Sequence, residues 1–577
     1  MAKFLIGVAT GVLLVFLSIF LVFFALLRFR ERPPEISANS VLVLRPTGAF
    51  PEKAPVEIPF LSDGPSLTVS NVWMALRKAA TDSHIRAVVL EPESLRAGWG
   101  KLEELRQDIA QFRKSGKPVY AYLHTPSARE YYVATAADRI YLGPADQIYL
   151  KGLRAEVMFF KNTLDKLGVS VDVEHAGKYK DFGDQFTRSE MSPETREVIN
   201  SLVDGIYSDL LAGIAQGRKK TPEQVSALID QGLFLAPELE KAGMVDALRF
   251  EDQMWGELKS RLGLSDGKSS DLKRVKAETY ARVPPEAVGQ AGKSRVALVV
   301  GEGDIVRGNP DNPASDEDSL TSTGFDKLLD QVGNDSSIRA VVVRIDSPGG
   351  EVRASDDIWR AMNLLSKKKP LVISMSDVAA SGGYYMAMTG DPIVAYPATE
   401  TGSIGVVFGK PNVRGLYNKL GITKDAVQRG KYADIDSDYT SLNSDERQKL
   451  QHGIDASYQD FIEKVAAARH RTAVEIDSVA QGRVWLGSQA KPRGLVDAIG
   501  GLDTAIELAK KKANIPAAEN VTVVSYPARR SILDLLMRRS QEDVLDVKLR
   551  SVFREMPFHA WMQGGLLRMM PFWITVR

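Results

Sequence analysis

The chain has 577 residues, of which 44% are hydrophobic and 25% charged, with a net charge of +1 and no cysteine. This length is too great for one ordinary hydrophobic core and predicts several domains. The near-zero net charge gives no reason to expect a nucleic acid or another strongly charged partner, and the lack of cysteine excludes disulfides, thiol catalysis and cysteine-ligated metals.

The N-terminus carries the first predicted element, a membrane-spanning helix. Residues 4–27 contain no charged side chain, and at ~1.5 Å per residue they are long enough to cross a hydrocarbon core of about 30 Å. The segment "RFRER" follows directly, unlike the small-residue cleavage site that closes a signal peptide. We therefore expect residues 1–35 to be an uncleaved anchor. The positive-inside rule alone would place the downstream side in the cytoplasm.

The rest of the chain is an internal duplication. "DSHIRAVVL" begins at Asp82 and "DSSIRAVVV" begins 253 residues later at Asp335, and the same offset relates Gly168 to Gly421. Repeated blocks in one order at one spacing indicate two related units. We predict the following boundaries: a first repeat at 36–265, a linker at 266–293, a second repeat at 294–525 and a tail at 526–577.

Each repeat has the pattern of an α/β fold. Apolar, β-branched runs such as "IRAVVL" and "KPLVISMS" alternate with amphipathic stretches of ten or more residues. That alternation is typical of parallel βαβ units with helices on the faces of the sheet. The tail has no counterpart in the first repeat. Its apolar and arginine-rich pattern suits either a membrane surface or docking on the protein itself, and we prefer docking.

Three Gly/Ser loops occur in the second repeat and not in the first. They are "SPGG" at 347–350, "ASGGYY" around Ser381 and "TGSIG" at 401–405, each after an apolar run, whereas the first repeat has "SLRA", "SAREYY" and "IYLKG". Loops that follow parallel strands are where sites gather. Glycine amides there are able to stabilise an oxyanion, so Ser381 is a candidate nucleophile.

A serine nucleophile needs a base, and the six histidines fall in no recognisable triad pattern. Lys178 has a counterpart, Lys431, whereas Lys180 faces Ala433 and occurs only in the repeat that lacks the serine. This reciprocal loss predicts one composite site per chain, with Ser381 as nucleophile and Lys180 as base, and leaves open whether the two meet within one chain or across two. The lysine must be neutral, so its pKa must fall from ~10.4, which burial can cause. The neighbouring Asp181 would oppose that fall unless it points away.

Four segments together resemble signal peptide peptidase A in its long, duplicated form, also called protease IV. They are "SPGG", "DVAASGGYY" and "TGSIG" in the second repeat and "GKYKDFGDQFTRSEMSP" in the first. The resemblance extends from the anchor to about residue 510. It implies two tandem domains with the fold of Clp protease and the crotonases. It also implies that Ser381 is the nucleophile, Lys180 the general base and Ser403 the residue that orients the lysine, with oxyanion amides from Gly349 or Gly350 and from Gly382.

The resemblance further implies a homotetramer bound to the bacterial inner membrane, with its catalytic part in the periplasm. Its substrates would be cleaved signal peptides and other small apolar peptides, with no cofactor, metal or nucleic acid. Two alternatives remain open on the residues alone. One is a crotonase-like acyl-CoA enzyme that shares the oxyanion loops, and the other is a membrane scaffold without activity.

Overall fold

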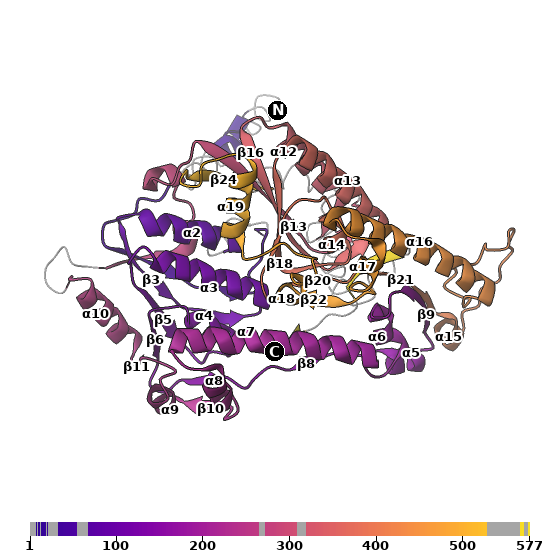
Figure 1. The fold of residues 1–577 in the computed structure, drawn as a ribbon, viewed down its shortest axis with the longest axis horizontal. Coiled ribbons are helices and arrows are strands. Elements are labelled where there is room, and N and C mark those ends of the chain that lie inside the picture. The colour runs from indigo at the N-terminus through magenta and orange to yellow at the C-terminus, as the bar shows by residue number, and fades with distance from the viewer. Residues whose placement is uncertain are drawn as a thin grey trace.

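The computed structural model describes residues 33–54, 67–264, 272–308, 319–527, 566–570 and 575–576, with ten residues between 7 and 20. Most of the expected anchor at 4–27 lies outside the described residues. The described part forms two α/β units side by side (Figure 1), which agrees with the predicted fold class.

The first unit is built on a parallel six-stranded sheet in the order β11-β6-β5-β3-β1-β12. Helices cover both of its faces, because alternate residues of each strand point to opposite sides. Val41 and Val43 pack with α10, whereas Leu42 and Leu44 face the core around α2 and α3. The strands are β1 (Ser40–Leu44), β3 (Ile85–Leu90), β5 (Val119–Leu123), β6 (Arg139–Leu142), β11 (Ala247–Leu248) and β12 (Lys273–Lys276).

The second unit repeats this order as β23-β19-β18-β16-β13-β24, and it adds β20 and the antiparallel β22. The stretch expected as a linker thus contains β12, which pairs with β1 as β24 pairs with β13. The strands are β13 (Ser294–Glu302), β16 (Ile338–Ser347), β18 (Leu371–Ala380), β19 (Ile393–Ala395), β20 (Glu400–Gly402), β22 (Val484–Leu486), β23 (Ala498–Ile499) and β24 (Val521–Tyr526).

Matching buried contacts confirm the duplication. The Tyr131 hydroxyl donates to the Met244 carbonyl at 2.7 Å in the first unit, and the Tyr384 hydroxyl donates to the Leu495 carbonyl at 2.8 Å in the second. The helices are α2 (Val69–Thr81), α3 (Trp99–Arg113), α4 (Ala128–Ala134), α5 (Lys161–Leu167), α6 (Asp184–Thr187), α7 (Pro193–Arg218), α8 (Pro222–Ile229), α9 (Ala236–Lys241), α10 (Glu251–Arg261), α11 (Ala277–Tyr280), α12 (Ser322–Asn334), α13 (Val352–Lys368), α14 (Gly382–Met386), α15 (Arg414–Lys419), α16 (Ser444–Arg469), α17 (Ala473–Asp477), α18 (Gly487–Ala490) and α19 (Leu502–Lys512), with 3-10 helices η1 (Asp181–Gly183) and η2 (Pro285–Val288).

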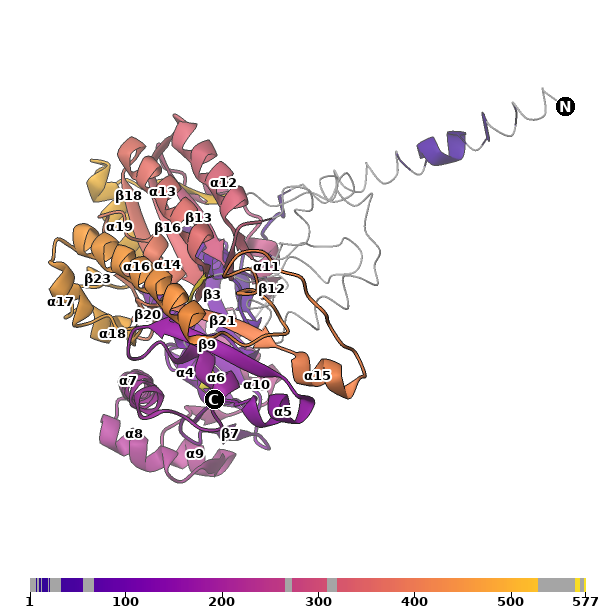
Figure 2. The ribbon, with the colours of Figure 1, turned by 90° about the vertical axis from the view of Figure 1, so that its right-hand side faces the viewer.

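A third sheet joins the two units and the tail in the order β15-β14-β17-β25-β21-β9. Strand β9 of the first unit pairs antiparallel with β21 of the second, so the first unit reaches across its neighbour (Figure 2). The strands are β9 (Ser170–Ala176), β14 (Ile305–Val306), β15 (Leu320–Thr321), β17 (Gly349–Glu351), β21 (Val406–Asn412) and β25 (Leu566–Met569), and the small pairs are β2 (Thr47–Gly48) with β4 (Glu93–Leu95), β7 (Gln147–Tyr149) with β10 (Leu233–Leu235), and β8 (Ala155–Glu156) with β26 (Thr575–Val576).

Among the described residues, helix α7 is long enough and apolar enough to cross a membrane. It runs along both units in Figure 1, and 44% of its most apolar window is buried in the protein. The Gln489 side chain from the second unit donates to the Ser201 carbonyl of this helix at 3.1 Å. Helix α7 therefore serves as a packed helix of the domain.

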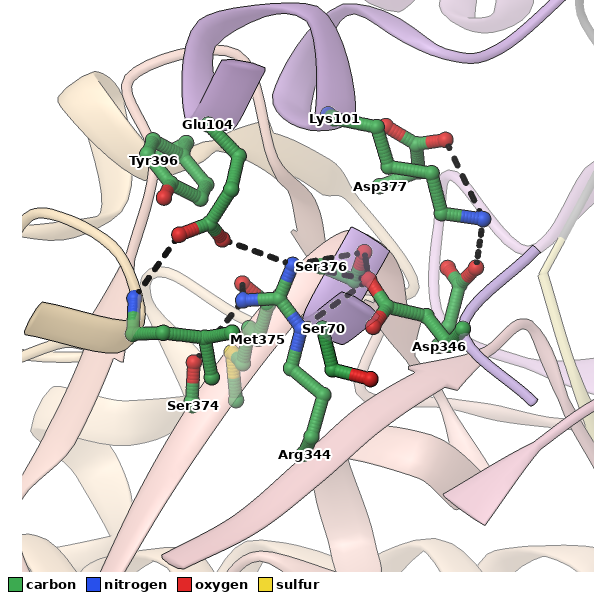
Figure 3. Close-up of polar contacts among 12 residues, drawn as sticks. Ser70, Lys101, Glu104, Arg344, Asp346, Ser374, Met375, Ser376, Asp377 and Tyr396 are labelled. Carbon is green, nitrogen blue, oxygen red and sulfur yellow. Dashed lines mark hydrogen bonds and ion pairs between the residues drawn. The ribbon is translucent and has the colours of Figure 1, made fainter. Parts of the chain in front are cut away.

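Buried charges join the two units beside β16 and β18 (Figure 3). The fully buried guanidinium of Arg344 on β16 lies 2.8 Å from Glu52 and 2.9 Å from Glu104, both in the first unit. Lys101 on α3 lies 2.7 Å from Asp346 and 3.8 Å from Asp377. Removing one partner of such a pair leaves an uncompensated buried charge, so this network fixes the position of β18, which leads to Ser381.

Candidate active site

The structure brings Lys180 and Ser381 together within one chain. The Lys180 Nζ atom lies 2.9 Å from Ser381 Oγ, 2.9 Å from Ser403 Oγ and 2.9 Å from the Ser403 carbonyl oxygen. All three side chains are 0% exposed. A neutral amine has two N–H donors and one lone pair. With both donors directed to the two Ser403 oxygens, the lone pair faces the Ser381 hydroxyl.

Ser381 occupies a strained turn between β18 and α14. Its φ is +53° and its ψ −113°, a backbone conformation that side-chain-bearing residues rarely adopt. The Ser381 amide donates to the Gly402 carbonyl at 2.8 Å, which anchors the turn to β20. Its side chain makes no capping bond to α14, so the hydroxyl stays available to Lys180.

Two glycines of the second unit make room for Lys180, which follows β9 of the first. A Cβ atom on Gly482 would lie 2.7 Å from the lysine Cβ, and one on Gly405 would lie 2.9 Å from its Cδ. The Tyr179 amide donates to the Gln481 carbonyl at 2.7 Å. The lysine is thus held in a slot that only residues without side chains can line.

Burial lowers the pKa of Lys180 well below its usual value, and the positive charge of Arg568 lowers it further. The carboxylate of Asp181 does not oppose this, because it accepts hydrogen bonds from Ser192 Oγ at 2.9 Å and Thr195 Oγ1 at 2.7 Å. Two hydroxyls thus hold the adjacent carboxylate in a network of its own. This local environment favours a neutral amine.

The three glycines expected at an oxyanion site lie together. A Cβ on Gly349, whose φ is +104°, would stand 2.6 Å from the Gly382 amide nitrogen and 2.0 Å from the carbonyl oxygen of Arg568 in the tail. The Gly349 amide itself donates to Ser347 Oγ at 3.3 Å. Of the two alternatives, Gly350 is therefore the better amide donor, and Gly349 supplies space.

Comparison with known proteins identifies the family of the chain. The family model described as Peptidase family S49 matches residues 111–265 and again residues 363–516. The chain belongs to peptidase family S49. One match contains Lys180, and the other contains Ser381 and Ser403. The two matches also repeat the duplication that the sequence and the sheets display.

Curated relatives of this S49 serine peptidase cover most of the chain. This chain is 38% identical to "Serine protease SPPA, chloroplastic" of Arabidopsis thaliana, over 78% of this chain and 66% of that protein. It is 32% identical to "Protease 4" of Salmonella typhi over 80% of this chain and 74% of that protein. "Protease 4" of Haemophilus influenzae is 30% identical over 78% of this chain and 73% of its own length. These relatives favour a peptidase over an acyl-CoA enzyme or a scaffold.

One component of the S49 peptidase site was missed in the sequence, namely strand β25 of the tail. It lies between β17 and β21, beside the oxyanion glycines, and contributes the buried Arg568. The described part of the tail therefore docks on the protein, as preferred from its sequence. The segment "LLRMM" has a charge inside an apolar run, but its position depends on pairing with strands over 150 residues away.

Proposed function

We propose that this S49 peptidase is a membrane-anchored serine endopeptidase that cuts apolar peptides, cleaved signal peptides among them, through an acyl-enzyme. The observation that carries the proposal is the 2.9 Å contact between Lys180 Nζ and Ser381 Oγ in a buried setting. A buried neutral amine next to a hydroxyl is the arrangement that activates a serine in the absence of histidine.

The proposed reaction has two halves. Lys180 Nζ takes the hydroxyl proton as Ser381 Oγ bonds to the carbonyl carbon of the substrate, and the amides of Gly350 and Gly382 stabilise the oxyanion. The C–N bond then breaks, and the leaving nitrogen receives that proton from Lys180. A water molecule next attacks the ester and gives its proton to Lys180. The proton returns to Ser381 as the acid product leaves.

An extended substrate would fit the gap between β17 and β21 that β25 occupies. Strands β17 and β21 both pair there with β25 as an added strand, the mode by which many extended peptides are bound. The walls of this gap include buried Phe182, Phe186 and Val407. They support a preference for apolar side chains, which signal peptides have in abundance.

Membrane anchoring and a catalytic part in the periplasm form part of the proposal. The uncharged stretch at 4–27 supports anchoring, and its described residues Leu13 and Phe16 are helical with exposed fractions of 69% and 68%. A homo-oligomer, a tetramer by resemblance, is also proposed. Its support is the segment after α15, the counterpart of the part of the first unit that carries Lys180, where Leu420 and Val427 are 65% and 89% exposed.

Probe labelling tests the nucleophile and the base. A fluorophosphonate should acylate the wild-type chain on Ser381 and fail on Ser381→Ala and Lys180→Ala. Lys178→Ala, two residues away on an exposed side chain, is the matched control and should label normally. A synthetic signal peptide should yield fragments with the wild type and with Lys178→Ala, and none with Ser381→Ala or Lys180→Ala. Labelling that survives Ser381→Ala would overturn the proposed mechanism.

A further inference from the structure

The tail strand β25 lies where the proposed substrate would bind. It runs antiparallel to β17, with Gly349 opposite Met569 and Gly350 opposite Arg568, and the Met570 amide donates to the Pro348 carbonyl at 2.9 Å. Hydrogen-bonded pairs alternate with non-bonded pairs along an antiparallel ladder. Since Pro348 and Met570 form one bonded pair, Gly350 and Arg568 form the next, and the Gly350 amide points at the Arg568 carbonyl. The Arg568 carbonyl is thus the one presented to the oxyanion glycines.

The side chain of Arg568 enters a pocket that suits a cation. It is 1% exposed, and its guanidinium carbon lies 3.6 Å from the centre of the Tyr385 ring and 5.2 Å from that of Phe461. Its Nη2 atom donates to Asp460 at 3.1 Å and to the Ser457 carbonyl at 3.3 Å. Aromatic faces and a carboxylate both attract a cation, more strongly where water is excluded.

The groups around the guanidinium combine an aromatic face with hydrogen-bond acceptors, and one lysine lies beside them. Lys464 contacts two carboxylates, at 2.5 Å from Asp460 and 3.3 Å from Asp356. The Tyr385 hydroxyl lies 2.9 Å from Asp460 and 2.7 Å from Asp356, and its single proton bonds to one of them at a time. A cavity of about 620 Å³ adjoins the Arg568 side chain, which is itself one of its lining residues.

We propose that this pocket selects a basic side chain, Arg or Lys, on the residue whose carbonyl carbon Ser381 attacks, and that the tail strand occupies the site as a substrate would. The inference rests on the proposed function and adds to it the chemistry of the recognised residue. The resemblance implied small apolar peptides as substrates, whereas the carboxylate of Asp460 in this pocket favours a cation at one position of the peptide.

Neighbouring positions of the strand remain apolar. Leu567 and Met569 point to the opposite side from Arg568, as a period of two requires, and they pack with Phe182, Phe186 and Val407. The favoured substrate is therefore a basic residue flanked by apolar ones. Signal peptides contain such a junction where the positively charged region meets the apolar region.

The pocket recognises charge and a flat shape more than one exact pattern of donors. Nε and Nη1 of Arg568 have no hydrogen-bond acceptor among the described residues, and the guanidinium stacks on Tyr385 instead. A lysine ammonium needs only the carboxylate and the ring face. Lysine should consequently be accepted with a modest loss relative to arginine.

Matched peptides test the selectivity on the full-length protein in detergent. They share the core Leu-Leu-X-Met-Met, with X as Arg, Lys, norleucine or Glu, and kcat/KM and the cut bond are determined by mass spectrometry. Cleavage after Arg and Lys should exceed that after norleucine about 10- to 100-fold, the effect of a charge-assisted hydrogen bond, and Glu should be worst. The aldehyde acetyl-Leu-Leu-argininal should likewise inhibit more strongly than acetyl-Leu-Leu-norleucinal.

Variants assign the selectivity to the pocket. Asp460→Asn should lower the Arg/norleucine ratio of kcat/KM about tenfold, whereas Asp455→Asn, on an adjacent turn of α16 and bonded to Gln451, should keep the wild-type ratio. Arg568→Glu should weaken the tail's hold on the groove and lower KM for every added peptide severalfold. Asp356→Asn offers a second route to the ratio if Asp460→Asn does not fold.

The outcomes separate this inference from the proposed function. Cleavage of the peptides with no preference for Arg or Lys, or with norleucine preferred, would overturn the basic pocket and leave the peptidase mechanism standing. No cleavage of any peptide together with no acylation of Ser381 would overturn the proposed function itself. An unchanged ratio in a folded Asp460→Asn protein would contradict the role of this carboxylate.

Discussion

Helices α4 and α14 occupy the same place in the two units, yet they begin differently. In the first unit Ser127 precedes the helix with an extended φ of −81°, and its side chain forms a capping box with Glu130. In the second unit Ser381 precedes the helix with a φ of +53° and makes no capping bond. The first serine stabilises a helix, while the second gives up that stabilisation and presents its hydroxyl to Lys180.

The residues near the two serines also differ between the units. Under the repeat offset, Gly349 and Gly382 correspond to Arg96 and Arg129 of the first unit. The first unit thus carries arginines at the positions where the second unit has glycines. The first unit contributes the proposed base, Lys180, from a slot lined by glycines of the second. The lysine and the serine of the proposed site therefore lie on different copies of the duplication.

The largest expected effect breaks this division directly. Ser381→Ala and Lys180→Ala should each reduce kcat/KM for a cleavable peptide by at least about 10⁴-fold, because the nucleophile and its base act as a unit. Ser127→Ala, which changes the serine that precedes α4 in the first unit, should leave kcat/KM within about twofold. A chain whose activity fell as much with Ser127→Ala would refute the comparison.

Gly349→Ala should have the next largest effect. The new methyl group would stand 2.0 Å from the carbonyl position now taken by Arg568, at a φ of +104° that disfavours alanine. Loss of oxyanion stabilisation costs about 10²–10³ in kcat. Arg96→Ala is the matched change in the first unit and should keep full kcat. Wild-type turnover by Gly349→Ala would argue against this location of the oxyanion.

The pH profile should be asymmetric because the base is a lysine with a lowered pKa. Acylation requires the neutral amine, so the rate should rise with pH through the pKa of Lys180 and should fall as the amine becomes protonated. Its described neighbours are Ser381, Ser403 and the cation of Arg568, with Asp181 bonded elsewhere. A peptide with Arg in the pocket should shift the midpoint to lower pH than its norleucine analogue, measured in single-turnover acylation. An identical midpoint would show that the two charges do not interact.

The smallest expected effects concern stability, and they have opposite signs. Ser127→Ala removes a helix cap and should lower the free energy of unfolding by about 1 kcal/mol.

Lys180→Met should raise the free energy of unfolding at pH 7. At that pH the lysine of the unfolded chain binds a proton that the buried amine does not bind, and a group of this kind makes stability increase with pH. Thermal unfolding at pH 7 and pH 9 would show the gain from Lys180→Met shrinking at the higher pH. A gain that does not change with pH would point to packing instead.

Much of the fold and the reacting pair could be predicted because duplication acts as an internal control. Lys178 has a counterpart in the other copy, Lys431, and both side chains are exposed. A residue lost from one copy, such as Lys180, points to chemistry. The direction of the Asp181 carboxylate could not be predicted, because it depends on hydroxyls of the next helix. The position of Arg568 could not be predicted either, because the tail has no second copy in the chain with which to compare it.

The separation of Lys180 from Ser381 by 201 residues has a consequence for biosynthesis. Domains fold in order as the chain leaves the ribosome, so the unit that supplies the base is made first and holds no nucleophile. The slot for the lysine closes only when Gly405 and Gly482 have been synthesised and folded against it. We therefore expect a chain that ends before Gly482 to lack peptidase activity, because its lysine and its serine are not yet held together.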